Sequence, residues 1–167
     1  MNTAGAELQT RSPEESLELG RAIGRLLRPG DCVALFGELG SGKTLIVKGL
    51  AQGLGSEDPV VSPTFNLMLE YRGRVPIRHL DAYFASREIA FLDEACGEVF
   101  DREGVAVVEW AERILEYLPP ERLEVRLEFL GPQARRIRLS GLSPRGEELL
   151  RNLLPAWNAK KDSRGGP

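Results

Sequence analysis

Cysteine is scarce in this chain of 167 residues, and long apolar runs are absent. Cys32 and Cys96 both stand among apolar residues, a pattern typical of buried, reduced thiols in a reducing compartment. No apolar run approaches the ~20 residues that a membrane-spanning helix needs, and residues 1–16 contain no apolar signal-peptide core. These absences predict a cytoplasmic protein that does not cross a membrane.

The chain also lacks an excess of positive charge, because 22 Lys and Arg residues stand against 25 Asp and Glu residues. The net charge is −3 and the sequence pI is about 5.4. This balance argues against a protein that grips nucleic acid unaided, because phosphate contacts need clustered cations. The chain has only four lysines, so the position of Lys43 in a glycine-rich segment is the more informative.

That segment, GELGSGKT at residues 37–44, matches the pattern G-x-x-x-x-G-K-[ST] and lies between an apolar run and a helical pattern. Glycines in such a loop let consecutive backbone N–H groups turn inward as an anion nest, and the next helix adds its positive dipole end. We expect Lys43 to reach the β- and γ-phosphates and the Thr44 hydroxyl to ligate Mg²⁺. The predicted nucleotide-binding residues are Gly37, Glu38, Leu39, Gly40, Ser41, Gly42, Lys43, Thr44 and Leu45.

The remaining pattern indicates an α/β protein. Residues 32–37 and 104–110 are short apolar runs typical of buried strands, and 122–130 and 134–142 alternate as antiparallel strands do. Helices are predicted at 12–27, 45–55, 86–100, 111–118 and 143–157, and a hairpin at 66–81. We predict a P-loop NTPase-like three-layer fold with a central mixed, partly parallel sheet flanked by helices. A single domain should occupy residues 1–157, followed by a disordered tail at 158–167.

Two acids are candidates for the magnesium site that a P-loop requires at the end of a neighbouring strand. Asp81 and Glu109 each end a predicted strand. The strand before Glu109 is the more hydrophobic and so the more central, and its carboxyl end should open into the ligand crevice of the sheet. The predicted metal residues are Thr44, Asp81 and Glu109.

The segment VSPTF, residues 61–65, follows the predicted P-loop helix, where other P-loop proteins carry a switch threonine that senses the γ-phosphate. Thr64 therefore joins Lys43 and Glu109 as a predicted catalytic residue. A plain Ser-Pro turn would produce the same pattern.

His79, the only histidine, stands two positions before Asp81. Because Mg²⁺ prefers oxygen ligands, we interpret His79 as a structural neighbour of that acid. Strand alternation places both side chains on one face, so the alternative is that His79 orients the metal site through a hydrogen bond.

Several classes of P-loop protein can be compared. A GTPase should carry N-K-x-D after a strand, and the nearest string, residues 159–162, lacks the asparagine. A small-molecule kinase needs an arginine-rich lid, and nothing in the sequence arranges the arginines as one. An ATPase, a non-hydrolysing nucleotide-sensing module and a small-molecule kinase all stay open.

The blocks GELGSGKT, VSPTF, HLDAYF and VVEWAER, in this order and spacing, resemble the TsaE (YjeE) family over about residues 12–142. The resemblance implies a cytoplasmic, Mg²⁺-dependent ATPase that binds ATP and ADP and supports threonylcarbamoyl modification of the tRNA adenosine beside the anticodon. It also implies action with the TsaB–TsaD pair, through which the tRNA is reached. Family members commonly have arginine after the tyrosine, where this chain has Phe84.

Some functions of individual residues are left open by the sequence. No arginine finger is identifiable, so we expect slow hydrolysis by the isolated chain. Glu109 either holds the metal or positions the water. Candidates for the adenine pocket are the segment near Ser12 and the Arg135–Arg136 hairpin, and Trp110 is either a core residue or a responder to nucleotide or partner.

Overall fold

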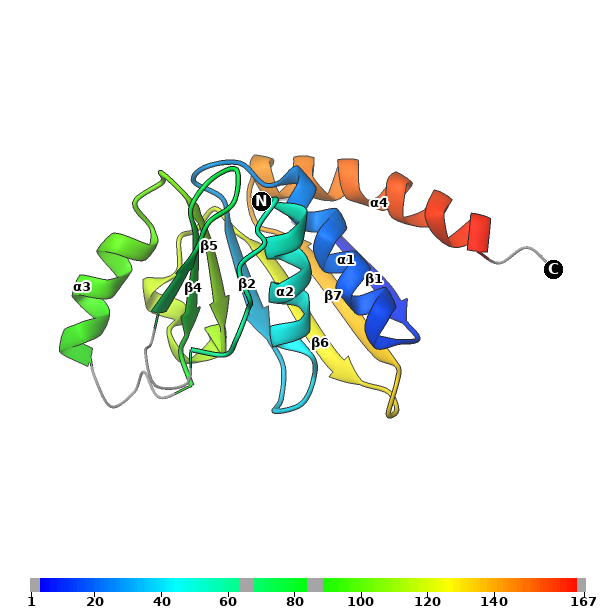
Figure 1. Ribbon diagram of the computed structural model, residues 1–167, viewed down its shortest axis with the longest axis horizontal. Helices are drawn as coiled ribbons and strands as arrows, with labels where there is room; N and C mark the ends of the chain where they lie inside the picture. Colours follow the sequence, from blue (N-terminus) through cyan, green and yellow to red (C-terminus); the bar gives the residue numbers. More distant parts are fainter. Residues whose placement is uncertain (1–3, 64–67, 84–88, 165–167) are drawn as a thin grey trace.

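The computed structural model describes residues 4–63, 68–83 and 89–164, with the backbone alone described at 89–91. Figure 1 shows its elements along the chain. The strands are β1 (Ala4–Thr10), β2 (Cys32–Phe36), β3 (Met68–Tyr71), β4 (Ile77–Asp81), β5 (Val105–Glu109), β6 (Leu123–Phe129) and β7 (Arg135–Gly141). The helices are α1 (Pro13–Leu26), α2 (Lys43–Gly53), α3 (Ile89–Val99) and α4 (Pro144–Arg164), with 3₁₀ turns η2 (Ala111–Arg113) and η3 (Leu115–Tyr117).

These strands form one mixed sheet in the order β1-β7-β6-β2-β5-β4-β3. The central strand β2 is parallel to β5 and β6, and β4 is parallel to β5. The pairs β1–β7, β6–β7 and β3–β4 are antiparallel. The architecture confirms the predicted α/β fold with a central, partly parallel sheet.

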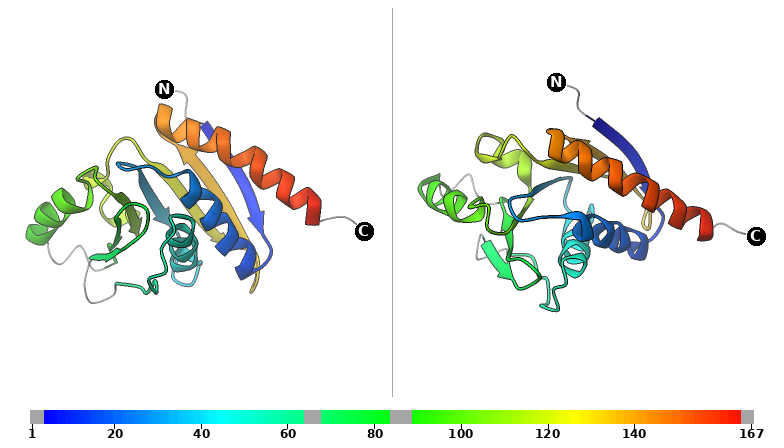
Figure 2. Two further views of the ribbon diagram at one scale, coloured as in Figure 1. Left: turned by 45° about the horizontal axis from the view of Figure 1, so that its top comes forward. Right: turned by 90° about the horizontal axis from the view of Figure 1, so that it is seen from above.

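Helices cover both faces of the sheet, because its central strands are apolar on both sides. Val33 and Leu35 of β2 pack in a core with α1, α2 and α4, whereas Ala34 and Phe36 pack in a second core with α3 and the 3₁₀ turns. Figure 2 shows α1 and α2 side by side on one face. The carboxyl ends of β2, β5 and β4 meet along the lower edge of the sheet in Figure 1.

Helices α1 and α2 approach closely through glycines. A Cβ atom added at Gly24 would lie 2.3 Å from the carbonyl oxygen of Leu50, and one added at Gly49 would lie 2.2 Å from that of Leu17. No side chain larger than hydrogen fits there without movement of the backbone. The start of α1 is as predicted, since the Ser12 side chain accepts a hydrogen bond from the Glu15 backbone N–H at 3.1 Å.

Three segments differ from the prediction. Strand β1 was not predicted, because its small residues have little strand preference and its pairing with β7 is what orders it. Residues 111–118 form two 3₁₀ turns instead of one helix. Helix α4 continues through residues 158–164, which were predicted as part of a disordered tail, because Trp157 is buried in the core and Lys160 pairs with Glu18 of α1.

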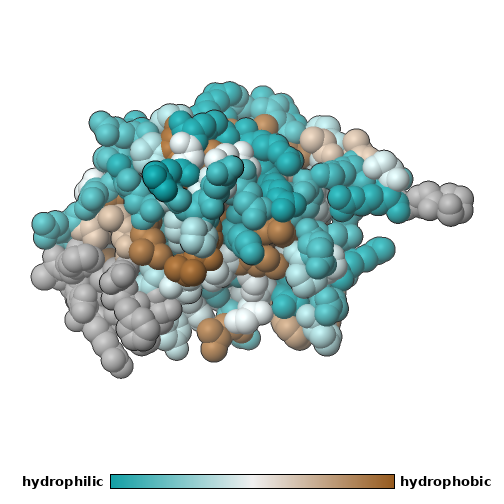
Figure 3. All heavy atoms as spheres, in the orientation of Figure 1, coloured by the Kyte–Doolittle hydropathy of each residue, from teal (hydrophilic) through white to brown (hydrophobic). Residues whose placement is uncertain are grey.

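No helix in residues 4–63, 68–83 and 89–164 has both the length and the apolar character needed to cross a bilayer. Figure 3 shows the face that carries α1 and α2, and most of it is hydrophilic. Hydrophobic residues show on this face as small, separate patches.

Candidate functional site

The segment 37–44 lies between β2 and α2, as the motif predicts. Gly40 and Gly42 have φ angles of +77° and +102°, in the left-handed region that favours glycine. Gly42 is the N-cap of α2, so the first backbone N–H groups of that helix are free of side-chain caps and face the loop. This arrangement is suited to bind an anion.

Lys43 is buried beneath this loop, with 4% of its surface exposed. Its Nζ donates hydrogen bonds to the carbonyl oxygens of Gly37 and Glu38 and lies 3.9 Å from the centre of the Trp110 ring. Burial lowers the pKa of Lys43, although the nearby carboxylates of Glu109, Glu112 and Asp81 oppose this shift. The ammonium group is thus held at the loop by the backbone and by an aromatic face.

The two predicted acids lie side by side. Asp81 and Glu109 are register partners at the ends of the parallel strands β4 and β5, and both are buried. The Thr44 hydroxyl donates to Glu109 at 2.9 Å, and the Ser62 hydroxyl donates to Asp81 at 3.0 Å. The P-loop helix and the acid-bearing strands are therefore connected by a direct hydrogen bond.

These side chains line one cavity of about 530 Å³. Its lining includes Leu39, Gly40, Gly42, Lys43, Thr44, Leu45, Ser62, Asp81, Tyr83, Glu109 and Trp110. Most of the predicted nucleotide-binding residues and all the predicted metal residues thus meet in one place. Thr64 lies outside the described residues.

The donors at this cavity fit Mg²⁺. Thr44, Asp81 and Glu109 all present oxygen atoms, which this ion prefers. Because Thr44 gives its hydroxyl hydrogen to Glu109, the lone pairs of its oxygen stay available to a cation. The described residues contain no cluster of three or more His, Cys, Asp or Glu side chains that could hold a metal.

The sequence leaves two interpretations of His79 open: a structural neighbour of Asp81, or a residue that orients the metal site through a hydrogen bond. The contacts of its ring agree better with the second. Its Nε2 lies 2.9 Å from Oε1 of Glu109, and its Nδ1 lies 3.0 Å from the hydroxyl of Tyr71. The carboxylate that His79 contacts is therefore that of Glu109 on the adjacent strand.

Two further residues contribute to the site in ways that the motif does not reveal. Trp110 has φ 56° and ψ 41°, a left-handed conformation that is rare for a large side chain and that places its ring beside Lys43 and Tyr83. Arg135 donates from Nε to the carbonyl oxygen of Ser41 at 2.8 Å and supports the outer side of the loop. Ser12, the other candidate for the adenine pocket, caps α1 and does not line the cavity.

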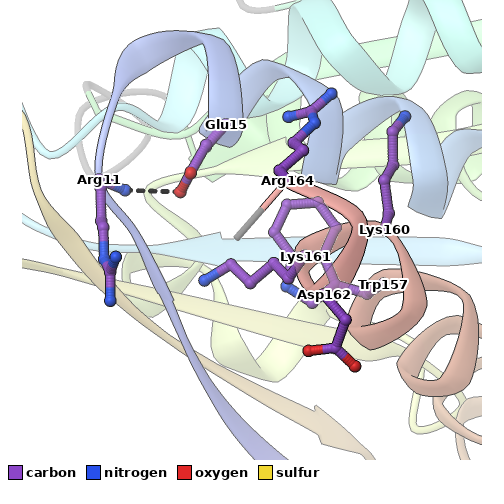
Figure 4. A pocket seen from close by; sticks show the side chains of 7 residues that line it. All are labelled: Arg11, Glu15, Trp157, Lys160, Lys161, Asp162 and Arg164. Carbon is purple, nitrogen blue, oxygen red and sulfur yellow. Dashed lines mark hydrogen bonds between the residues drawn. The ribbon is translucent and has the colours of Figure 1, made fainter. Parts of the chain in front are cut away.

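A second hollow of about 340 Å³ lies between the start of α1 and the end of α4 (Figure 4). The two lysine side chains that line it have different partners: Lys160 pairs with Glu18, and Lys161 donates to the carbonyl oxygen of Gln9. The side chains of Arg11 and Arg164 extend in different directions in Figure 4. This hollow contains none of the predicted site residues.

The comparisons with known proteins agree with this geometry. The family model described as threonylcarbamoyl adenosine biosynthesis protein TsaE matches residues 10–137. The crystal structure of YdiB from Bacillus subtilis superimposes with a TM-score of 0.76 at 32% identity, covering 97% of this chain and 99% of that one.

Curated relatives carry the name tRNA threonylcarbamoyladenosine biosynthesis protein TsaE. The relative from Treponema pallidum is 42% identical over 110 residues, which cover 66% of this chain and 82% of that protein. The relative from Bacillus subtilis is 42% identical over 118 residues, which cover 70% of this chain and 73% of that protein. The P-loop, the paired acids and these matches together show that the chain belongs to the TsaE family of threonylcarbamoyl adenosine biosynthesis proteins.

Proposed function

We propose that this protein binds ATP and hydrolyses it slowly with Mg²⁺, in support of threonylcarbamoyl modification of the tRNA adenosine beside the anticodon. The observation that carries the proposal is the hydrogen bond between Thr44 of the P-loop helix and Glu109 of β5. This bond joins a phosphate-binding loop to a strand-end acid, which is the arrangement that phosphoryl transfer uses in P-loop NTPases.

The residues have distinct roles in this proposal. Backbone N–H groups of residues 37–44 bind the phosphates, and Lys43 supplies positive charge to the β- and γ-phosphates. Thr44 would hold Mg²⁺, with Asp81 and Glu109 binding it directly or through water, and the ion would neutralise charge on the phosphates. Glu109 also lies at the cavity, where it is placed to orient an attacking water toward the γ-phosphate. Thr64 stays a predicted sensor of that phosphate.

The partner assignment comes from the family. Relatives are named for tRNA threonylcarbamoyladenosine biosynthesis, and we propose that this chain acts in the cytoplasm with the TsaB–TsaD pair. Its net charge of −3 supports contact with tRNA through those partners, because a surface with few clustered cations binds phosphates poorly.

The test is Mg²⁺-dependent release of phosphate from ATP by the purified chain, alone and with the TsaB–TsaD pair of the same organism. Slow hydrolysis that increases with the pair, and that is lost in Lys43→Met, is the expected result. Tight ATP binding without hydrolysis under either condition would contradict the proposal and favour a nucleotide-sensing module. A matched control is Lys48→Met, since Lys48 is exposed on the same helix.

A further inference from the structure

A chain of buried polar groups leads from Glu109 away from the cavity. Oε1 of Glu109 lies 2.9 Å from Nε2 of His79, and Nδ1 of His79 lies 3.0 Å from the Tyr71 hydroxyl. The single hydrogen of that hydroxyl is directed to the carbonyl oxygen of Val61 at 3.0 Å. This series of hydrogen-bonded side chains crosses three adjacent strands, β5, β4 and β3, and ends on the loop that follows α2.

Burial restricts the movement of the side chains that make these contacts. His79 is fully buried, and Tyr71 and Glu109 are 4% and 3% exposed. A polar group that lost its partner here would have no water to replace it, which costs more than the bond itself contributes. The three side chains therefore keep their orientations relative to one another.

The Glu109 carboxylate is held from two directions. A carboxylate only accepts hydrogen bonds, so Nε2 of His79 carries the hydrogen in their contact. The Thr44 hydroxyl donates to the same carboxylate from the P-loop helix. Together these donors fix the rotation of the group on which the proposed water or metal contact depends.

Consecutive residues of the loop after α2 are connected to the two acids, one indirectly and one directly. Val61 reaches Glu109 through Tyr71 and His79, and Ser62 donates directly to Asp81. A displacement of this loop would change the hydrogen bonding of both carboxylates at once.

We propose that His79 and Tyr71 are positioning residues, which orient the Glu109 carboxylate and couple it to the loop at residues 60–62. This inference rests on the proposed hydrolysis of ATP at the same cavity. Partners that orient a metal-site carboxylate typically contribute about 10- to 100-fold in metal affinity or activity. We expect losses of that size when the chain of hydrogen bonds is cut.

His79 provides a direct spectroscopic test, because it is the only histidine of the protein. In ¹⁵N NMR spectra of untagged protein, Glu109→Gln should shift the Nε2 signal and Tyr71→Phe the Nδ1 signal. Addition of ADP with Mg²⁺ should change the wild-type signals, whereas ADP with EDTA should leave them nearly unchanged. Signals that stay the same under both conditions would overturn the coupling.

Kinetics supplies the second test. His79→Leu removes both hydrogen bonds, His79→Gln keeps an N–H donor toward Glu109, and Tyr71→Phe removes only the hydroxyl. We expect kcat to fall about 10- to 100-fold in His79→Leu, less in Tyr71→Phe, and to recover in large part in His79→Gln. The affinity for ATP in EDTA should be unchanged in all three, since none of these side chains lines the cavity.

The matched control is Tyr117→Phe, which removes a hydroxyl near the opposite ends of β2 and β5 and should leave kcat at the wild-type value. If His79→Leu does not fold, Tyr71→Phe and His79→Gln still decide the question. A wild-type protein that does not hydrolyse ATP would refute the proposed function. Wild-type kcat in folded Tyr71→Phe and His79→Leu, with hydrolysis still lost in Lys43→Met, would refute the positioning role alone.

Discussion

Asp81 and Glu109 are register partners at the carboxyl ends of two adjacent parallel strands, β4 and β5. They differ in what they contact, because Glu109 accepts from Thr44 and contacts His79, whereas Asp81 accepts from Ser62 and from the backbone N–H of Tyr83. Glu109 is thus connected to the P-loop helix and Asp81 to the loops around the cavity. The two acids should respond differently to substitution.

Replacing Glu109 by glutamine should greatly slow hydrolysis while ATP remains bound. The amide keeps the shape of the side chain and loses its charge, and a positioned acid–base group typically contributes about 10²- to 10⁴-fold to the rate. Single-turnover hydrolysis and an ATP-binding titration check this expectation. The control is Glu112→Gln, which removes an exposed acid near Lys43; equal losses in both variants would show that general charge, and not the Glu109 contacts, is responsible.

Lys43→Met should weaken ATP binding by about 10- to 100-fold, since a charge-assisted hydrogen bond contributes about 1.5–3 kcal/mol. Lys48→Met on the exposed face of the same helix should bind like the wild type. Isothermal titration with ATP and Mg²⁺ measures both affinities. Undiminished binding in Lys43→Met would mean that its ammonium group does not reach the phosphates.

Gly49→Ala should destabilise the fold by about 1–3 kcal/mol, because the added methyl group overpacks the interface between two helices. Its Cβ would lie 2.2 Å from the Leu17 carbonyl oxygen. The matched substitution is Gly97→Ala in α3, where nothing lies within 4 Å of the added Cβ, and there the higher helix propensity of alanine should add up to about 1 kcal/mol. Urea unfolding of the two variants should therefore give shifts of opposite sign.

The protein should lose part of its stability in acid through Glu18. Burial alone would raise its pKa, but hydrogen bonds from Lys160, Arg21 and Arg25 outweigh that effect and lower the pKa to about 2. Since the pKa in the folded state lies below the usual value of 4.5, the stabilisation is present above that pH and is lost as the pH falls toward 2.

Glu18→Gln removes this contribution. At pH 7 the variant should be less stable than the wild type by about 1 kcal/mol, a value reduced by solvent around the exposed cations. The difference should shrink as the pH falls below 4.5. A difference in the free energy of unfolding that is the same at pH 7 and pH 3 would show that the charge of Glu18 is not the cause.

The parts of the site that depend on local sequence could be predicted. The P-loop is a continuous motif, and the hydrophobic strand before Glu109 correctly indicated a central strand beside β2. Asp81 could be recognised as an acid at the end of a predicted strand, whereas its position beside Glu109 is set by the pairing of β4 with β5.

Contacts between residues distant in the sequence could not be predicted in this way. The bond from Arg135 to the Ser41 carbonyl joins residues 94 positions apart, and no pattern in either segment indicates it. The same holds for the contact of His79 with Glu109, because alternation gives the face of a strand and not the partner on the next strand. Strand β1 and the end of α4 likewise depend on tertiary partners, namely β7 and Glu18.

The close glycine contact between α1 and α2 restricts the movement of α2, and no such contact restricts the loops on the opposite wall of the cavity in the part that the structure describes. Backbone meets backbone there, so α2 has little room to slide along α1 or to tilt against it. In the described parts of the facing loops, the contacts at the cavity come from side chains: Ser62 donates to Asp81, and the Tyr83 ring packs against the Trp110 ring. We therefore expect the P-loop to serve as a fixed reference against which the opposite wall of the cavity changes between the ATP-bound and ADP-bound states.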